Sequence, residues 1–402
     1  MTPIHEPLSE EAAARLVMIA GLSATPFSIS GGGTRSLLSA ADGAEQLSTR
    51  GLNGIVAYNP AEMTMTARAG TPLEKVEAAL AENRQMLAFE PVDLRGVLGS
   101  SGIPTIGGVF ATNASGPRRF VAGAARDSLL GVRFVNGKGE IVKAGGRVMK
   151  NVTGLDLAKL LAGSHGSLAL LTEVTFRVLP MPETAVTIVI SGLNDAEATA
   201  AMATAMALPV EVSGAAHLPE SVRGRFAGGA LPDGAATVLR LEGLAASVSV
   251  RAQKLADAMA GFGAVSQCDA GLTQRLWREI RDAAPYADGT SRPLWRVSVA
   301  PTAGQQLVAA LRLEAGVDAF YDWQGGLVWL RMESDPEAAL LRRYIKAVGG
   351  GHATLLRARP EVLSTTEIFQ PQTDAVTALQ TAVKASFDPH GLFRAPGGFI
   401  AQ

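Results

Sequence analysis

Three glycine-rich segments carry the residues best suited to chemistry in this sequence. The first, Ser30–Arg35, places three consecutive glycines after a short apolar run and before a hydroxyl and a guanidinium. Glycine leaves backbone N–H groups unobstructed, and such groups beside a cation suit a pyrophosphate. The string matches neither G-x-x-x-x-G-K nor G-x-G-x-x-G, so neither of those nucleotide loops is predicted. Taken alone, the segment fits a flexible turn equally well.

The second and third segments have the same character. Gly96–Pro117 is uncharged and holds six glycines and two prolines, which allows a planar or phosphorylated ligand to lie against the main chain. A tight crossing of backbones is the alternative for this segment. Lys150–Glu173 includes Gly163-Ser164-His165-Gly166, which by itself would fit a glycine-capped helix. The three segments in this order are far more specific than any one of them.

With these segments in place, residues 25–180 resemble the FAD-binding domain of the vanillyl-alcohol oxidase type, also called the PCMH type. In that family, the segment that matches Gly31–Arg35 cradles the FAD pyrophosphate, and the other two wrap the rest of the dinucleotide. Some relatives attach FAD through a His or Tyr near this loop, where Thr34 and Ser36 stand here. The resemblance therefore implies non-covalent FAD. The FAD contacts that it implies are Gly31, Gly32, Gly33, Thr34, Arg35, Pro104, Gly107, Gly108, Asn113, Gly116, Gly163, Gly166 and Leu171.

A narrower resemblance extends over nearly the whole chain, to the E subunits of bacterial glycolate oxidases. It rests on Lys150–Gly154 with Asp156, Leu294–Pro301, Asp322-Trp323 with Gly325-Gly326, Gly350–Ala353 and Phe387–Phe393. The tail departs from the family, which usually reads Phe-Asn-Pro-Gly-Arg, because here Phe393 is followed by Arg-Ala-Pro-Gly-Gly.

This resemblance implies an FAD-dependent 2-hydroxy acid oxidoreductase subunit of a hetero-oligomeric complex. Such a complex oxidises glycolate to glyoxylate, and electron transfer runs from the flavin to the partners: a catalytic FAD-containing D-type subunit and an iron–sulfur F-type subunit. Two alternatives remain open, a stand-alone FAD-dependent 2-hydroxy acid dehydrogenase and a non-catalytic structural subunit. We expect Gly32→Asp to block the approach of a pyrophosphate, and an unchanged activity would favour the structural alternative.

Oxidation of a 2-hydroxy acid needs a hydride acceptor, a cation for the carboxylate and a base for the hydroxyl proton. The candidate cations are Arg296, Arg331 and Arg357, and the best candidate base among five histidines is His352. A structural role is open for each of these four. His165 is expected to have a backbone role and His217 to lie in a loop. No histidine stands in the metal motif that D-type relatives carry, so no metal site is predicted.

Composition limits the class of protein further. The 402 residues include 36 Lys and Arg against 37 Asp and Glu, and this balance argues against a nucleic-acid binder. Cys268 is the single cysteine, so no intrachain disulfide or cysteine-held metal is expected. The N-terminus does not read as a signal peptide, and no transmembrane segment is predicted. We expect a cytoplasmic protein, with peripheral attachment to the inner membrane through partners as an option.

Start and stop signals outline the elements that position these residues. Ser9–Ala20 reads as a helix with Ser9 as N-cap, and Asn136-Gly137 joins two strands in a hairpin. Met63–Ala69 alternates as a half-buried strand does. Thr71, followed by Pro72 and Glu74, predicts a capping box at the start of the next helix.

The order of these elements predicts an α+β fold. We expect a PCMH-type FAD-binding domain of two α/β subdomains over residues 1–180, with a first boundary near Pro180 and Pro182. A smaller α+β cap domain is expected over 181–375, where strands and helices alternate. Residues 376–402 are expected to return to the FAD-binding domain.

Overall fold

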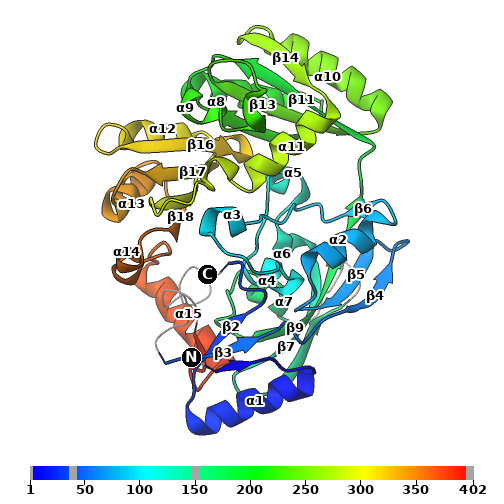
Figure 1. Cartoon of the computed structure of the whole chain (residues 1–402), viewed down its shortest axis with the longest axis vertical. Coiled ribbons are helices and arrows are strands. Elements are labelled where there is room, and N and C mark those ends of the chain that lie inside the picture. The colour runs from blue at the N-terminus through cyan, green and yellow to red at the C-terminus, as the bar shows by residue number, and fades with distance from the viewer. Residues whose placement is uncertain (1–2, 36–42, 147–153, 395–402) are drawn as a thin grey trace.

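The computed structural model describes residues 3–35, 43–146 and 154–394. Ser36, the Lys150–Thr153 part of the third segment and the tail from Ala395 onward lie outside the described residues. The chain forms a lower part with two sheets and an upper part with one large sheet, and both described ends lie in the lower part (Figure 1).

The lower part holds a four-stranded parallel sheet, in the order β1 (Ile4–His5), β3 (Glu45–Ser48), β2 (Phe27–Ser30) and β19 (Phe393–Arg394). Strand β19 therefore brings the C-terminal segment onto this sheet. The second sheet is antiparallel, in the order β4 (Ile55–Asn59), β5 (Thr64–Arg68), β9 (Leu170–Arg177), β7 (Leu129–Val135) and β8 (Ile141–Gly145). The helices of this part are α1 (Glu10–Ser23), α2 (Leu73–Ala81), α3 (Arg95–Leu98), α4 (Ile106–Ala111), α5 (Arg119–Ala122), α6 (Ala125–Ser128) and α7 (Leu157–Leu161).

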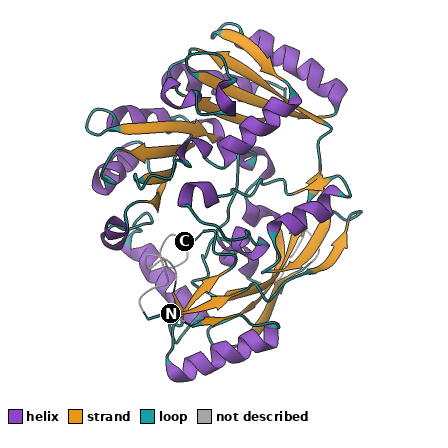
Figure 2. Cartoon of the chain, viewed as in Figure 1, coloured by secondary structure: helices purple, strands orange, loops and turns teal. Residues whose placement is uncertain are grey.

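A short connection leads to the upper part. Strands β6 (Gln85–Met86) and β10 (Leu179–Pro180) pair with each other just before the chain enters the large sheet. That antiparallel sheet has the order β14 (Ala264–Cys268), β11 (Thr184–Ser191), β13 (Ala236–Gly243), β12 (Val212–Leu218), β16 (Val317–Asp322), β17 (Leu327–Met332), β15 (Leu294–Ser298) and β18 (His352–Arg357). Its helices, drawn in purple in Figure 2, are α8 (Asp195–Ala207), α9 (Glu220–Arg223), α10 (Ala245–Met259), α11 (Ala270–Arg281), α12 (Ala303–Leu311) and α13 (Ala338–Ala347), followed by α14 (Pro360–Thr365) and α15 (Asp374–Phe387).

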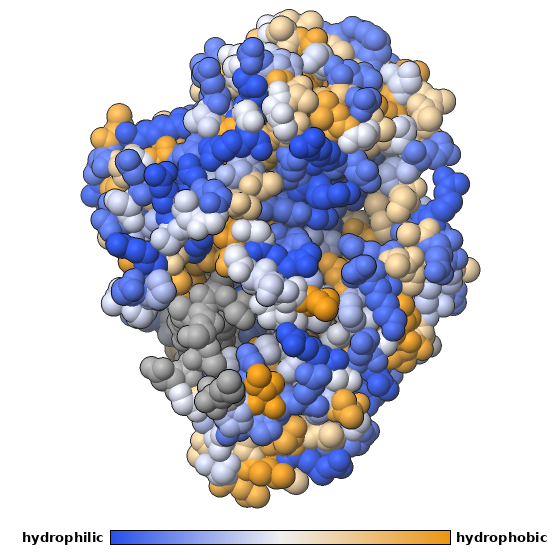
Figure 3. All heavy atoms as spheres, viewed as in Figure 1, coloured by the Kyte–Doolittle hydropathy of each residue, from blue (hydrophilic) through white to orange (hydrophobic). Residues whose placement is uncertain are grey.

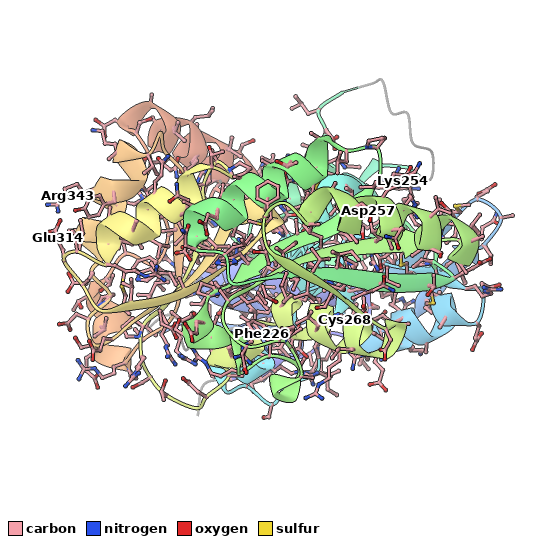
Figure 4. All side chains as sticks on the ribbon, turned by 90° about the horizontal axis from the view of Figure 1, so that it is seen from above. Phe226, Lys254, Asp257, Cys268, Glu314 and Arg343 are labelled. Carbon is pink, nitrogen blue, oxygen red and sulfur yellow. The ribbon has the colours of Figure 1, made fainter. Side chains whose placement is uncertain are left out.

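The two faces of the large sheet have different neighbours. Helices α8, α10, α12 and α13 pack on the outer face, and α11 packs on the inner face together with Val92 and Val97 of the lower part. Viewed from above, α10 with Lys254 and Asp257 lies on one side of the sheet, and Phe226 lies on the other (Figure 4). The inner face of the large sheet is thus turned toward the glycine-rich segments.

Several local predictions are confirmed. Ser9 caps α1, because its Oγ accepts a hydrogen bond from the Ala12 N–H at 3.2 Å, which stabilises a helix by about 1 kcal/mol. Strands β7 and β8 form the predicted hairpin, with Val135 paired to Ile141.

Two other local predictions are wrong. Strand β5 is buried on both faces rather than half-buried, and the Thr66 and Thr175 hydroxyls satisfy each other at 2.9 Å. Thr71 does not cap α2, because its hydroxyl donates to the Arg68 and Gly54 carbonyls and accepts from the Gly54 N–H. Pro72 occupies the cap position, without a side-chain hydrogen bond. A tertiary partner outcompetes the local cap in this case.

None of the helices in the described part of the chain combines the length and apolar character that a membrane crossing requires.

Candidate functional site

A cavity of about 450 Å³ in the lower part is lined by residues of β2, β9 and α4. The first glycine segment forms one wall, and residues of the second and third segments complete it. Nine of the thirteen residues predicted to contact FAD line this cavity. They are Gly31, Gly32, Gly33, Thr34, Arg35, Gly107, Gly108, Gly166 and Leu171.

Some glycines of this wall are required by packing alone. A Cβ on Gly32 would stand 1.5 Å from the Ile103 carbonyl oxygen, and one on Gly102 would stand 1.8 Å from the Gly32 oxygen. A Cβ on Gly107 would stand 2.6 Å from the Ala69 Cβ. The first two segments therefore cross at backbone contact, and the alternative of a tight crossing is correct for these glycines.

Other glycines of the wall face open space. A Cβ on Gly108 would meet only the Thr105 hydroxyl, at 3.2 Å, and one on Gly33 would meet only the Arg50 guanidinium, at 3.8 Å. Gly33 has φ +76°, which favours glycine. At these two positions the missing side chain keeps the cavity wide and the main chain accessible.

Arg35 stands at the inner end of this cavity. Its guanidinium donates to the Thr112 hydroxyl at 3.1 Å and to the Val92 carbonyl at 2.6 Å. Burial lowers the pKa of Arg35 from its ordinary value to about 10, which leaves it a cation at neutral pH. Both partners are neutral, so the positive charge is not cancelled by direct contact with a carboxylate of the described residues.

A second cavity, of about 110 Å³, adjoins the first and shares Arg35, Thr112 and His165 with it. Its far wall belongs to the inner face of the large sheet. The residues that the sheet contributes are Arg296 of β15, Trp329 of β17, and Thr354 and Leu356 of β18. The predicted contact Asn113 also lines it. This small cavity therefore lies between the lower and upper parts of the chain.

Strand register aligns the donors of that wall. Arg296 is paired with Trp329 on one side and with Thr354 on the other, so the three side chains stand in a row across β17, β15 and β18. The Trp329 indole Nε1 is buried and has no hydrogen-bond partner in the described part of the chain. Arg296 contacts the Trp323 ring at 5.0 Å and forms no hydrogen bond or ion pair with the described residues. Burial lowers the pKa of Arg296 to about 10, so it too remains charged.

His165 lies at the junction of the two cavities. Its backbone has φ +52°, and its N–H donates to the Ala111 carbonyl at 2.8 Å. The ring meets Phe369 edge-on, with centroids 5.3 Å apart. Burial, aided by the charge of Arg35, lowers the pKa of His165 to about 4, so the imidazole is neutral at pH 7.

The remaining catalytic candidates lie away from both cavities. Arg331 forms ion pairs with Asp288 at 2.6 Å and Asp318 at 2.9 Å. Arg357 donates to the Arg292 and Tyr286 carbonyls and lies 3.4 Å from Asp288. These contacts give both arginines a structural role. His352 is exposed at the start of β18 and lines neither cavity.

Three predicted FAD contacts also lie outside the cavity linings: Pro104, Gly116 and Gly163. The Pro104 carbonyl accepts from the Leu73 N–H at the start of α2, and the Gly116 carbonyl accepts from the Trp323 indole at 3.0 Å. Gly163 has φ +86° and donates to the Phe110 carbonyl. Each of these residues holds the segments together.

Sequence reasoning missed several lining residues. Trp329 and Thr354 carry no local motif, and the signal that identifies them is their register with Arg296. The expectation of a loop around His217 is wrong, because His217 is 1% exposed inside β12 and contacts Thr237 at 3.0 Å. Thr105 lines the large cavity, and its hydroxyl accepts from the Gly108 N–H at the start of α4.

Buried charges join the two parts beside this site. Arg240 of the large sheet donates to both Glu90 oxygens, at 2.9 and 3.0 Å, and Arg118 pairs with Glu242 at 2.6 Å. These four residues border a groove of about 600 Å³ between α2 and α11. Figure 3 shows hydrophilic residues gathered round a hollow between the two parts. In the described residues, no group of three or more His, Cys, Asp or Glu side chains is arranged to hold a metal ion.

Comparisons with known proteins identify relatives of this chain. The FAD binding domain family matches residues 4–145. The chain is 31% identical over 385 residues to glycolate oxidase subunit GlcE of Escherichia coli (strain K12), covering 94% of this chain and 93% of that protein. It is 37% identical over 143 residues to a D-2-hydroxyglutarate dehydrogenase of Xanthomonas citri pv. viticola, covering 36% of this chain and 29% of that protein.

Solved structures share the fold at lower identity. p-Cresol methylhydroxylase with substrate bound has a TM-score of 0.71 at 14% identity, covering 98% of this chain and 88% of that one. The 4-ethylphenol oxidase of Gulosibacter chungangensis has a TM-score of 0.70 at 13% identity, covering 99% of this chain and 89% of that one. These matches confirm the predicted α+β fold of the PCMH type.

Proposed function

The chain belongs to the family of glycolate oxidase subunit GlcE, and from this premise we propose that it is the FAD-binding subunit of a glycolate oxidase-type complex that oxidises glycolate to glyoxylate. It is an FAD-dependent oxidoreductase subunit of a family with FAD-linked 2-hydroxy acid dehydrogenases among its relatives. The observation that carries the proposal is the glycine-lined cavity, which shares Arg35, Thr112 and His165 with a small cavity rich in hydrogen-bond donors.

The residues of the large cavity fit FAD. Gly33 and Gly108 leave space that a Cβ would fill, and Arg35 supplies a cation. None of the described residues that line the cavity carries a carboxylate that would repel a pyrophosphate. When bound, FAD supplies the acceptor for a hydride. We assign its binding to the nine predicted residues in the wall together with Asn113 at the inner end.

We propose that this FAD is held without a covalent bond. Thr34 is 5% exposed, and it stands next to the glycines, where covalent relatives carry a His or Tyr. Acid precipitation of the purified chain should therefore release all of the flavin into the supernatant. Flavin retained in the protein pellet would contradict this assignment.

We propose electron transfer from this flavin to partner subunits. The chain is also 34% identical over 134 residues to glycolate oxidase subunit GlcD of Bacillus subtilis (strain 168), covering 33% of this chain and 27% of that protein, and the name subunit in both relatives supports an assembly. The partners proposed are a D-type flavoprotein and an iron–sulfur F-type subunit. We propose a cytoplasmic complex that reaches the inner membrane only through those partners. Affinity purification of the native complex, with flavin and iron quantified per chain, tests the composition.

A stand-alone 2-hydroxy acid dehydrogenase is the second candidate, and the small cavity beside the large one favours it. Anaerobic mixing of the isolated holoprotein with glycolate or D-lactate separates the two. Bleaching of the flavin without partners supports the stand-alone enzyme, and bleaching only in the complex supports the subunit. A purified chain that takes up no FAD would leave the structural alternative.

We also propose domain limits at 1–180, 181–375 and 376–402, the last returning to the first. The pairing of β19 with β2 and the short strand β10 before the large sheet support these limits. Limited proteolysis should cut first near Met181, which is 45% exposed. A first cut elsewhere would move the boundary.

A further inference from the structure

We propose that the small cavity binds a small 2-hydroxy acid, with Arg296 and the Trp329 indole N–H as donors to the carboxylate and His165 as acceptor of the hydroxyl proton. The inference rests on the proposed function, because FAD in the large cavity is the hydride acceptor. It adds a place for the substrate and three residue roles to that function.

The wall of the small cavity that the large sheet forms carries two hydrogen-bond donors that meet no acceptor in the described residues. Arg296 lacks a protein acceptor among the described residues, and the Trp329 N–H is a buried donor without a partner, although Trp329 is only 1% exposed. A buried donor left unsatisfied costs about 1–3 kcal/mol, so such a group is expected to meet a ligand. The two donors stand side by side because β15 and β17 pair in register at these residues.

Charge in the cavity selects an anion. The titratable side chains among the described lining residues are Arg35, Arg296 and His165, so two cations face the space and no carboxylate does. A guanidinium beside a neutral N–H donor matches the two oxygens of one carboxylate. A cationic or neutral aromatic substrate would leave these donors without acceptors.

Arg296 is held in place by an aromatic ring that also contacts the lower part of the chain. Its guanidinium lies 5.0 Å from the Trp323 ring, and Arg119 of α5 lies 4.5 Å from the same ring. The Trp323 indole N–H donates to the Gly116 carbonyl of the second glycine segment. Trp323 therefore fixes the sheet-borne cation relative to the cavity in which FAD would bind.

The size of the cavity limits the substrate to a short acid. Its volume of about 110 Å³ corresponds to three or four water molecules at ~30 Å³ each. Val92, Leu356 and Phe369 form apolar parts of its wall. This space suits an acid of two or three carbons and excludes long or aromatic side chains.

Two observations assign the proton acceptor to His165: the chemistry of the other lining residues and its own position. Among the described residues that line either cavity, it is the one side chain that is neutral at pH 7 and carries an imidazole nitrogen as a proton acceptor. It also stands at the boundary between the cofactor space and the substrate space. A neutral imidazole there is in the form that accepts a proton.

With FAD bound in the large cavity, it would supply the acceptor for the hydride, with both electrons, of the C2–H bond that breaks in the acid. The hydroxyl O–H bond would break at the same time, and its proton would go to a ring nitrogen of His165. The C2–O single bond would become a carbonyl, so the acid would lose two electrons and two protons and become the 2-oxo acid.

Binding of a non-oxidisable carboxylate tests the donors directly. FAD content and the affinity for oxalate, followed through the flavin spectrum and by calorimetry, are measured for the holoprotein within its complex. Arg296→Gln should weaken oxalate binding at least tenfold, and Arg296→Lys should restore part of the loss. Trp329→Phe should weaken it several-fold. Because Trp329 is a core side chain that is 1% exposed, the variant also loses packing, so its thermal unfolding is measured and oxalate binding is compared at a temperature at which it is folded. Arg15→Gln, on the exposed side of α1, is the matched control and should change nothing.

The outcomes of these measurements distinguish a failure of the substrate site from a failure of the proposed function. A wild-type chain that binds no FAD overturns the proposed function. A chain that binds FAD, but whose oxalate affinity is unaffected by Arg296→Gln and Trp329→Phe, overturns only the substrate site.

The role of His165 is tested by measuring the affinity for oxalate and the rate of flavin reduction separately. His165→Asn should keep the affinity for oxalate within about threefold and slow flavin reduction by glycolate roughly 100-fold or more. Equal losses in affinity and rate would assign His165 a structural role and contradict its part in the proposal.

Discussion

Gly108→Ala is the substitution that separates cofactor binding from folding most cleanly. Gly108 lies inside α4 and has an ordinary helical backbone, and an added Cβ would meet only the Thr105 hydroxyl at 3.2 Å. Replacing a helical glycine by alanine stabilises a helix by about 1 kcal/mol. The apoprotein should therefore unfold at the same temperature or slightly higher.

The same methyl group projects into the cavity that we assign to FAD. It would take up space that FAD needs against this wall, and an extra methyl group in a close-packed site costs about 1–3 kcal/mol. The dissociation constant for FAD should therefore rise roughly 5- to 150-fold. Fluorescence titration of the apoprotein with FAD measures this change, and differential scanning calorimetry of the apoprotein measures the stability.

The control is Gly21→Ala, in α1. Its Cβ would meet the His390 ring at 3.6 Å, an ordinary contact remote from the cavity. It should give the same helix stabilisation with no change in FAD affinity. Unchanged affinity in Gly108→Ala, with stability preserved, would refute the assignment of this wall to FAD.

The structure also shows that Gly32→Asp, the substitution suggested by the sequence, is not a suitable test of FAD binding. Gly32→Asp cannot report on the pyrophosphate, because a Cβ there would stand 1.5 Å from the Ile103 carbonyl oxygen. The variant should fail to fold, whatever the role of the flavin.

Four further predictions follow from the contacts of named side chains. Glu90→Gln removes the carboxylate that Arg240 and Arg118 share, and it should lower the free energy of unfolding by about 3–5 kcal/mol in urea titration, with Arg278→Gln as the control. Burial alone would raise the pKa of Glu242, but Arg240 and Arg118 lower it to about 2, so stability should fall as pH drops from about 5 to 2, and a flat thermal midpoint across that range would contradict this. Burial raises the pKa of Asp322 to about 7, so the folded state holds a proton that the unfolded state has lost, and stability should decline between about pH 4 and 7. Asp322→Asn should remove that decline and stabilise the protein at pH 8 more than at pH 5, by at most about 4 kcal/mol. His352→Ala should leave FAD content and the rate of glycolate oxidation unchanged, because His352 is exposed and lines neither cavity; a large loss of rate would reinstate it as the base.

Local signals predicted the elements well where no distant partner competes with them. The Ser9 cap of α1 and the hairpin of β7 and β8 depend on neighbours in the sequence, and both occur as expected. Thr71 was misread because the carbonyl and N–H of the distant Gly54, together with the nearby Arg68 carbonyl, satisfy its hydroxyl better than a helix end does. Strand β5 was misread because the hydroxyls of Thr66 and Thr175 bond to each other and so can be buried.

The segments that form the site were predictable from the sequence. Which residues of neighbouring strands and segments meet there was not. The resemblance led to nine glycine-segment residues that now line one cavity. It did not distinguish Gly108, which faces that cavity, from Gly32, which is required by a backbone crossing. Arg296, Arg331 and Arg357 are alike in sequence, and only the pairing of strands shows that two of them meet acids or carbonyls while the third faces a cavity beside Trp329.

The central claim is that this chain binds FAD in the glycine-lined cavity. The most direct test is the flavin content of the purified wild-type chain and of Gly108→Ala after saturation with FAD and removal of excess by gel filtration. We predict close to one FAD per wild-type chain, with the visible spectrum of an oxidised flavin, and clear loss from the folded variant. A wild-type chain that is folded and carries no flavin after saturation would contradict the account.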